Sequence, residues 1–173
     1  MNAFFTKILG SGLMLMAGFV AAAYVKRIYS ARTAALRDYQ KLLELLMNKI
    51  KSSDKVLTDC LIECANEYTC QASELFVEAA KNLAVNGKTP DEAWKEAVDK
   101  TCTQLKSKDI QTLKELGMLL GATDRDGQVR LISELIDNLS KLELESDELA
   151  KKDGSLYSKL CIAGVVCIII VFL

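Results

Sequence analysis

Six cysteines carry most of the reactive chemistry available to this 173-residue chain, because it contains no histidine. Without an imidazole the chain cannot form a Ser-His-Asp triad, a Cys-His dyad or a histidine metal site. Cys60 and Cys64 are four residues apart and share one face if that segment is helical. Together with Cys70 and Cys102 they offer four thiolates, but structural zinc sites favour two cysteines separated by two residues. We expect buried thiols, keep a metal site as the alternative, and expect no cofactor.

Acidic residues gather at two places, and neither matches a metal motif. Asp124 precedes Gly127, but a calcium loop needs further oxygen ligands at fixed offsets and a terminal glutamate. A second cluster lies nearer the C-terminus, where a di-iron site would need Glu-x-x-His motifs. The members of this cluster are Glu143, Glu145, Asp147 and Glu148. We expect it to be either a solvated helix face or a face that meets a basic patch on a partner protein.

The composition excludes several functional classes. Basic residues number 22 and acidic residues 23, so the charge balance does not favour nucleic acid as a partner. Gly117 and Gly121 lack the Lys-Ser/Thr pair that completes a phosphate-binding loop. We therefore expect neither an enzyme nor a nucleic-acid-binding protein. The mean hydropathy is +0.15, which is high for a chain with 26% charged residues, and the apolar excess lies at the two ends.

The first uncharged run begins at Ile8 and ends at Val25. As a helix it would be about 27 Å long, close to the thickness of a membrane's hydrocarbon core. Lys7 before the run and three consecutive alanines near its end also fit a cleaved signal peptide. Because two basic residues follow directly, at positions 26 and 27, and resist export, the favoured interpretation is a retained transmembrane anchor at residues 1–25.

The second uncharged run begins at Leu160 and ends at Leu173, and counted from Gly154 it spans 20 residues with Lys159 as the single charge. A lysine side chain can extend to the lipid headgroups, so residues 154–173 are expected to form a second membrane segment. Positive charges flank both runs on the side of the central region. Residues 26–153 are therefore expected to form a cytoplasmic domain, with both termini outside.

Small residues in the first run permit close helix contact. Ala17 and Ala21, like Gly18 and Ala22, are four residues apart, which is the spacing of a small-xxx-small pair. Such a face can pair the two membrane segments or join the chain to another protein, including a second copy.

The central region has the pattern of six α-helices. Ala, Leu, Glu and Lys dominate it, and alternation of β-branched residues is nearly absent. Apolar residues recur at three- and four-residue spacing, so each helix has one face directed at a shared core. The expected core residues are Leu36, Tyr39, Leu43, Leu46, Ile50, Val56, Cys60, Cys64, Leu75, Phe76, Ala79, Ala80, Leu83, Ala93, Trp94, Ala97, Val98, Leu105, Ile132, Leu135, Ile136, Leu139, Leu142 and Leu149. We predict an all-α, six-helix antiparallel bundle with short connections, flanked by N- and C-terminal membrane helices.

Local motifs predict where several helices begin and end. Thr89 is followed by Pro90 and by Glu92, which is the pattern of a capping box with proline in the first turn. Gly121 is expected just after a helix in a left-handed conformation, and Gly117 where two helices approach closely. The Asp-Gly-Ser sequence at 153–155 is a candidate break in the last helix.

These features together resemble the stage III sporulation protein AB family of endospore-forming Firmicutes. The resemblance rests on the motif Glu115-x-Gly117-x-x-Leu120-Gly121-x-x-Asp124, on a long amphipathic helix with Gln128 near its start, and on a hydrophobic run after Lys151-Lys152. It covers nearly the whole chain.

The resemblance implies a membrane-anchored part of the channel complex between mother cell and forespore, located in the mother-cell membrane around the forespore. The helical domain would be similar to that of the type II secretion inner-membrane platform protein F, and its partners would be lipid, other channel subunits and a cytoplasmic ATPase. The family brings no catalytic residues. Our leading hypothesis is a non-enzymatic scaffold, and the alternative is a membrane-bound helical signalling or regulatory protein.

Overall fold

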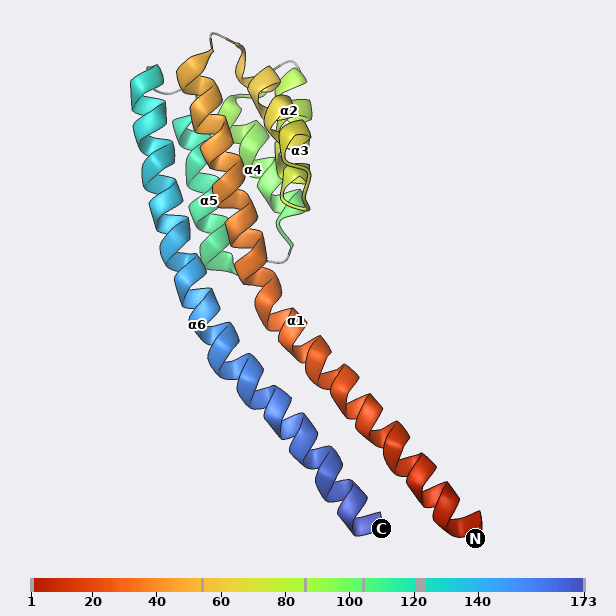
Figure 1. The fold of residues 1–173 in the computed structure, drawn as a ribbon. Coiled ribbons are helices and arrows are strands. Elements are labelled where there is room, and N and C mark those ends of the chain that lie inside the picture. The colour runs from red at the N-terminus through yellow and green to blue at the C-terminus, as the bar shows by residue number, and fades with distance from the viewer. Residues whose placement is uncertain (1, 54, 86, 104, 121–123, 173) are drawn as a thin grey trace. The chain divides into compact units, whose positions relative to one another are not determined.

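The described residues form six α-helices: α1 (Asn2–Ser52), α2 (Leu57–Glu67), α3 (Ser73–Ala84), α4 (Pro90–Thr101), α5 (Ser107–Leu119) and α6 (Arg125–Phe172) (Figure 1). The computed structural model describes residues 2–53, 55–85, 87–103, 105–120 and 124–172, without the side chains of 2–15, 25, 26, 28, 29, 153, 154, 157, 158, 161 and 165–172. Within this range there is no strand, so the predicted all-α class is confirmed.

The chain divides into two compact units. Residues 34–144 form the first, which we call the bundle, and residues 1–33 with 145–173 form the second, which we call the helix pair. Both α1 and α6 contribute to each unit, because each of them is one continuous helix. The predicted domain boundaries, after residues 25 and 153, lie inside these two helices.

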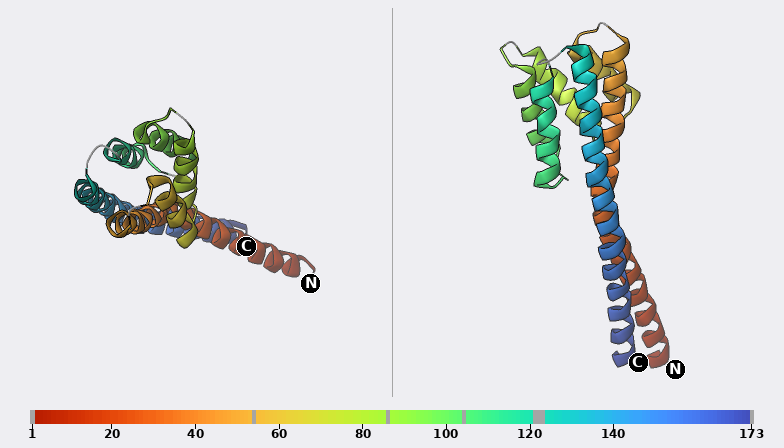
Figure 2. Two further views of the ribbon diagram at one scale, coloured as in Figure 1. Left: turned by 90° about the horizontal axis from the view of Figure 1, so that it is seen from above. Right: turned by 90° about the vertical axis from the view of Figure 1, so that its left-hand side faces the viewer.

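In the bundle, helices that follow one another in the sequence pack beside one another. Contacts join α2 to α3, α3 to α4 and α4 to α5, and successive helices alternate in direction (Figures 1 and 2). Because the connections are short, each helix packs antiparallel to the one before it. A single cluster of buried apolar side chains draws on all six helices, as the helical spacing of the apolar residues predicted.

Two residues of the expected core are exposed. Val56 is 68% exposed because it precedes α2 with an extended backbone and is not part of the helical face that follows it. Leu149 is 36% exposed and belongs to the helix pair, beyond Leu142, the last core residue of α6. Helical spacing alone did not show where on α6 the covered stretch ends.

Polar caps define where the helices of the bundle begin. The predicted capping box is present, because Thr89 Oγ1 accepts from the Glu92 amide at 3.3 Å and the Glu92 carboxylate accepts from the Thr89 amide at 3.0 Å. At α5, the buried Asp109 carboxylate accepts from the Lys106 amide at 3.0 Å. Each of these contacts satisfies an amide that lacks a partner within its helix.

The helix pair consists of the first part of α1 and the last part of α6. The backbone is helical through residues 153–155, so the candidate break predicted there is absent. Gly18 and Ala22 are buried, whereas Ala17 and Ala21 are exposed. Of the two small-xxx-small faces, the one formed by Gly18 and Ala22 therefore lies inward.

Across the described residues, no helix contains an 18-residue stretch that is apolar enough and poor enough in charge to cross a membrane. Much of the predicted span from Ile8 to Val25, and of that from Leu160 to Leu173, has side chains outside the described residues. Both spans therefore stay predictions.

Candidate functional site

The four carboxylates of the acidic cluster on α6 differ in how far they are exposed. Glu143 Oε1 accepts from Arg37 Nε on α1 at 2.7 Å, and Asp147 Oδ2 lies 2.6 Å from Lys151 Nζ, one turn further along α6. Glu145 and Glu148 are exposed. Glu145 and Glu148 are therefore the two more exposed carboxylates of the cluster, and Glu143 and Asp147 are half-buried.

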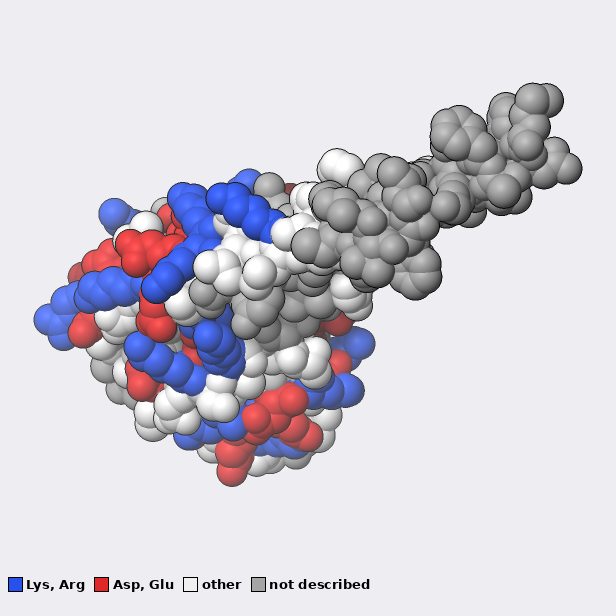
Figure 3. All heavy atoms as spheres, turned by 90° about the horizontal axis from the view of Figure 1, so that it is seen from below, with Lys and Arg blue, Asp and Glu red and all other residues white. Residues whose placement is uncertain are grey.

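Outside this cluster, charge of both signs is mixed over the bundle. Figure 3 shows basic and acidic side chains interspersed on the face seen from below. Many pair locally: Lys49 Nζ, for example, lies 2.9 Å from Glu67 and 3.4 Å from Glu63, which joins α1 to α2. Pairs at such exposed positions each contribute at most about 1 kcal/mol, so they orient neighbouring helices more than they stabilise the fold.

The two long helices are linked within the helix pair by a buried hydroxyl pair. Thr33 Oγ1 donates to Ser146 Oγ at 2.9 Å, and both residues are less than 9% exposed. If either hydroxyl were removed or displaced, the other would be buried without a hydrogen-bond partner, which is unfavourable. The contact therefore favours this alignment of α1 with α6. The sequence alone does not predict this contact, because a threonine and a serine more than a hundred residues apart form no recognisable motif.

Gly117 lies where α4 and α5 approach closely. A Cβ atom added at Gly117 would be 2.9 Å from Asp91 Oδ1, 3.1 Å from the Asp91 carbonyl oxygen and 3.2 Å from Trp94 Cδ1. The carboxylate oxygen thus occupies the space that any larger residue would need. The other oxygen of Asp91 accepts from Lys95 Nζ at 2.8 Å, which holds the carboxylate in this position.

Trp94 fixes the same crossing from the other side. Its indole Nε1 donates to the Leu113 carbonyl oxygen at 2.7 Å, and its ring meets that of Phe76 edge to face, with centroids 5.6 Å apart. The indole is therefore anchored both by a hydrogen bond and by an aromatic contact. The chain's only tryptophan is a core residue of α4 and is 1% exposed.

Gly121 and Asp124 follow Gly117 in the same sequence motif. Gly121 lies outside the described residues, so its expected left-handed conformation stays a prediction. Asp124 caps α6: its Oδ1 accepts from the Gly127 amide at 3.3 Å and its carbonyl oxygen accepts from the Gln128 amide at 2.9 Å. The helix begins at Arg125, directly after this cap. Gln128, expected near the start of the helix, is the fourth residue of α6.

Four cysteines lie among the side chains that the structure describes, and these four are free thiols. Cys60, Cys64 and Cys102 are buried, and Cys70 is partly exposed. Burial raises the pKa of the Cys64 thiol to about 12 and raises that of Cys102 as well. Such thiols are neutral and weakly nucleophilic at physiological pH. In the described residues, no three side chains of His, Cys, Asp or Glu gather as metal ligands.

Tyr39 and Tyr68 connect α1 to loops at one end of the bundle. The buried Tyr39 hydroxyl lies 3.2 Å from Cys102 Sγ, and burial raises its pKa. Tyr68 Oη donates to Asp38 Oδ1 at 2.7 Å, and Lys41 Nζ lies 4.1 Å from the Tyr68 ring centroid. These contacts are structural: each tyrosine uses its hydroxyl to hold a loop against α1.

The described fold is all-α: α2 to α5 pack with parts of two long helices, α1 and α6, around one core. Comparison with known proteins is consistent with that class. The family model for stage III sporulation protein AB matches residues 7–173. The chain therefore belongs to the stage III sporulation protein AB family, as the sequence resemblance predicted.

Two individual proteins illustrate the similarity. Stage III sporulation protein AB of Bacillus subtilis (strain 168) is 23% identical over 167 residues, which cover 95% of this chain and 98% of that protein. A solved structure of stage III sporulation protein AB matches with a TM-score of 0.64 and 22% identity, covering 69% of this chain and 96% of the other. At that identity the structural likeness supports the fold alone.

Proposed function

We propose that this chain is a membrane-anchored, non-enzymatic component of the channel complex between mother cell and forespore. In this proposal the helical domain is cytoplasmic, the helix pair enters the mother-cell membrane around the forespore, and the domain couples a cytoplasmic ATPase to other channel subunits in the membrane ring. Membership of a sporulation protein family supports the process.

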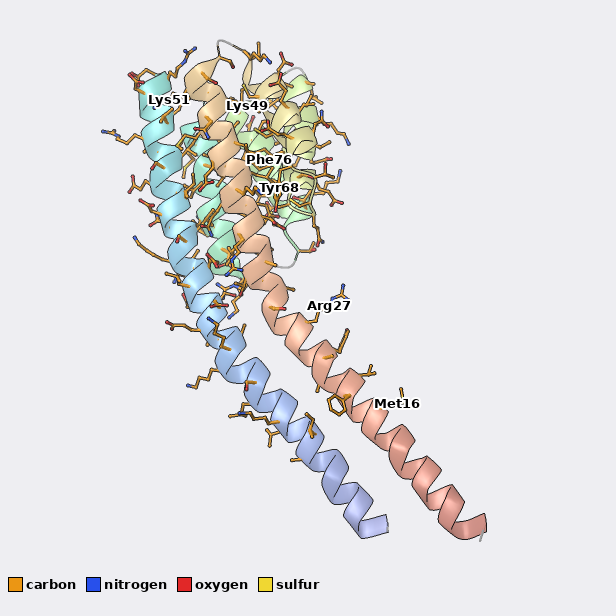
Figure 4. The ribbon with its side chains drawn as sticks, in the orientation of Figure 1. Met16, Arg27, Lys49, Lys51, Tyr68 and Phe76 are labelled. Atoms are coloured by element: carbon orange, nitrogen blue, oxygen red, sulfur yellow. The ribbon has the colours of Figure 1, made fainter. Side chains whose placement is uncertain are left out.

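The observation that carries the proposal is the exposed apolar surface of the helix pair. Four large side chains of α1 are each between 65% and 68% exposed: Met16, Phe19, Val20 and Tyr24. On α6, Leu156 and Leu160 are more than half exposed. A continuous apolar surface of this kind is unfavourable in water and marks a membrane or protein contact. Met16 projects outward from α1 (Figure 4), which suits contact with lipid.

Charge favours one orientation in the membrane. Arg27 follows the exposed apolar residues of α1 and projects outward (Figure 4), and Lys151 and Lys152 precede those of α6. Positive residues remain on the cytoplasmic side of a membrane segment, so the bundle should be cytoplasmic and both termini outside.

The orientation is tested by labelling intact cells with a membrane-impermeant maleimide, using a chain whose native cysteines are replaced. In non-sporulating cells that express the chain, Lys88→Cys in the turn before α4 should stay unlabelled until the cells are opened, whereas Asn2→Cys, which faces the medium there, should be labelled at once. Labelling of Lys88→Cys in intact cells would overturn the cytoplasmic placement of the bundle.

The candidate partner surface is tested by charge reversal. Glu145→Lys with Glu148→Lys should leave folding intact but reduce recovery of the ATPase subunit with the chain. The difference from the parent chain should be largest at low salt and shrink as salt is raised, because salt screens exposed charges. The matched control is Glu134→Lys with Asp137→Lys, which reverses two exposed carboxylates elsewhere on α6. Equal recovery from both variants at every salt concentration would show that Glu145 and Glu148 form only a solvated face.

A further inference from the structure

One face of α6 in the helix pair carries a groove with unusual chemistry. Its volume is about 490 Å³, which is within the range of ligand-binding clefts. Lysines line one part of it, at positions 151, 152 and 159, together with the hydroxyl of Ser155. Apolar side chains, chiefly Leu156 and Leu160, line the rest. The lining residues recur at three- and four-residue spacing, so they share a single side of the helix.

The charge of the groove is positive and only partly compensated. Lys151 Nζ lies 2.6 Å from Asp147 Oδ2, so one lysine is neutralised within the chain. Lys152 and Lys159 are exposed and form no ion pair with any described residue. Two ammonium groups are thus available to an anionic ligand that reaches both.

The polarity of the groove changes along the helix axis. Lys152 and Lys159 are separated by about 10 Å at the rise of an α-helix, and the flexible lysine stems allow both ammonium groups to reach a point between them. Ser155 lies in that interval. The apolar wall formed by Leu156 and Leu160 continues toward the C-terminus. A ligand with an anionic head and an apolar tail matches both parts of this surface, whereas a soluble anion would leave the apolar part uncovered.

We propose that this groove binds an anionic phospholipid. The phosphate accepts hydrogen bonds from Lys152, Lys159 and Ser155, and an acyl chain lies along Leu156 and Leu160. The proposal rests on the membrane anchoring argued above. It also accounts for Lys159, the single charge after residue 153, because an anionic headgroup offsets the unfavourable placement of a lysine next to an apolar run. A zwitterionic lipid carries its own cation and would leave the lysines uncompensated.

The test measures lipid binding to the purified full chain in detergent by native mass spectrometry. Phosphatidylglycerol should form bound complexes at concentrations where phosphatidylcholine does not. Lys152→Gln with Lys159→Gln should weaken phosphatidylglycerol binding by about 10- to 30-fold, as expected for two lost contacts of about 1 kcal/mol each. The matched control, Lys81→Gln with Lys141→Gln, removes two exposed lysines of the bundle and should bind like the parent chain.

Several outcomes would overturn the lipid site. These are equal binding of the two lipids, unchanged binding by the Lys152/Lys159 variant, and displacement of phosphatidylglycerol by millimolar inorganic phosphate, which would indicate a general anion site. A separate measurement distinguishes this failure from failure of the proposed function. If the parent chain resists extraction from membranes by alkaline carbonate but shows no lipid preference, the anchoring stands and only the lipid site is wrong. If carbonate extracts it, both proposals fail.

Discussion

The bundle and the helix pair differ in how far their large apolar side chains are exposed. In the bundle, large side chains such as Trp94 and Phe76 are less than 2% exposed and belong to one core to which α1 to α6 all contribute. In the helix pair, side chains of similar size such as Phe19 are about two-thirds exposed. The bundle is therefore stabilised from within, whereas the helix pair has apolar surface that only another molecule can cover.

Glycines show the same contrast at the scale of one atom. A Cβ at Gly117, in the bundle, would meet backbone and side-chain atoms of α4, whereas a Cβ at Gly164, in the helix pair, would meet nothing within 4 Å. Packing in the bundle is thus tight enough to dictate residue size, while the described surface around Gly164 is open to whatever surrounds it.

The largest expected difference between the two units comes from removing an aromatic side chain. Trp94→Ala should lower the free energy of unfolding by about 3–5 kcal/mol, because it leaves a cavity and removes the hydrogen bond to Leu113. Phe19→Ala, the matched change in the helix pair, should alter it by less than about 0.5 kcal/mol. Urea unfolding of the full chain in detergent, followed by circular dichroism, measures both. Comparable losses would mean that the two units share one core.

A smaller difference is expected when the two glycines are replaced by alanine. Gly117→Ala should destabilise by about 1–2 kcal/mol, because Asp91 and Trp94 must move to admit a methyl group. Gly164→Ala should be neutral or stabilise by up to about 1 kcal/mol, because alanine has the higher helix propensity and the site is open. Thermal unfolding of the two variants side by side provides the measurement. A stabilising Gly117→Ala would show that α4 and α5 are further apart than described.

The smallest effect concerns alkaline pH and is confined to the bundle. The pKa of Cys64 is raised from 9.0 to about 12 in the folded chain, so the neutral thiol contributes stability that is complete below pH 9 and is lost as pH rises toward 12. The loss should reach about 1 kcal/mol by pH 9.5. Urea midpoints at pH 7.5 and 9.5 measure it, and Cys64→Ala should show a smaller decrease between the two. An identical decrease in the variant would assign the alkaline sensitivity to other groups, such as Tyr39.

Much of the bundle could be predicted from the sequence, because its rules are local. The capping box at Thr89 and Glu92 and the helical spacing of the core residues from Leu36 to Leu142 each depend on residues near one another in the chain. The close approach at Gly117 was expected from the glycine itself, although the atoms it meets belong to Asp91 and Trp94 on α4. The exposed position of Leu149 was not predictable, because it depends on how far the covering helices extend. Within the acidic cluster, the contact of Glu143 with Arg37 joins residues more than a hundred positions apart, which no local pattern reveals.

The order in which neighbouring helices pack also bears on how the chain folds as it is synthesised. Because α2 meets α3, α3 meets α4 and α4 meets α5, most contacts of the bundle are local, and local contacts favour rapid folding. These four helices can associate while the ribosome is still translating α6, at about 5–20 residues per second. The core residues Ile132 to Leu142 of α6 arrive afterwards and complete it. The apolar stretch after Lys159 follows these core residues in the chain, so the bundle can assemble before that stretch reaches its final surroundings.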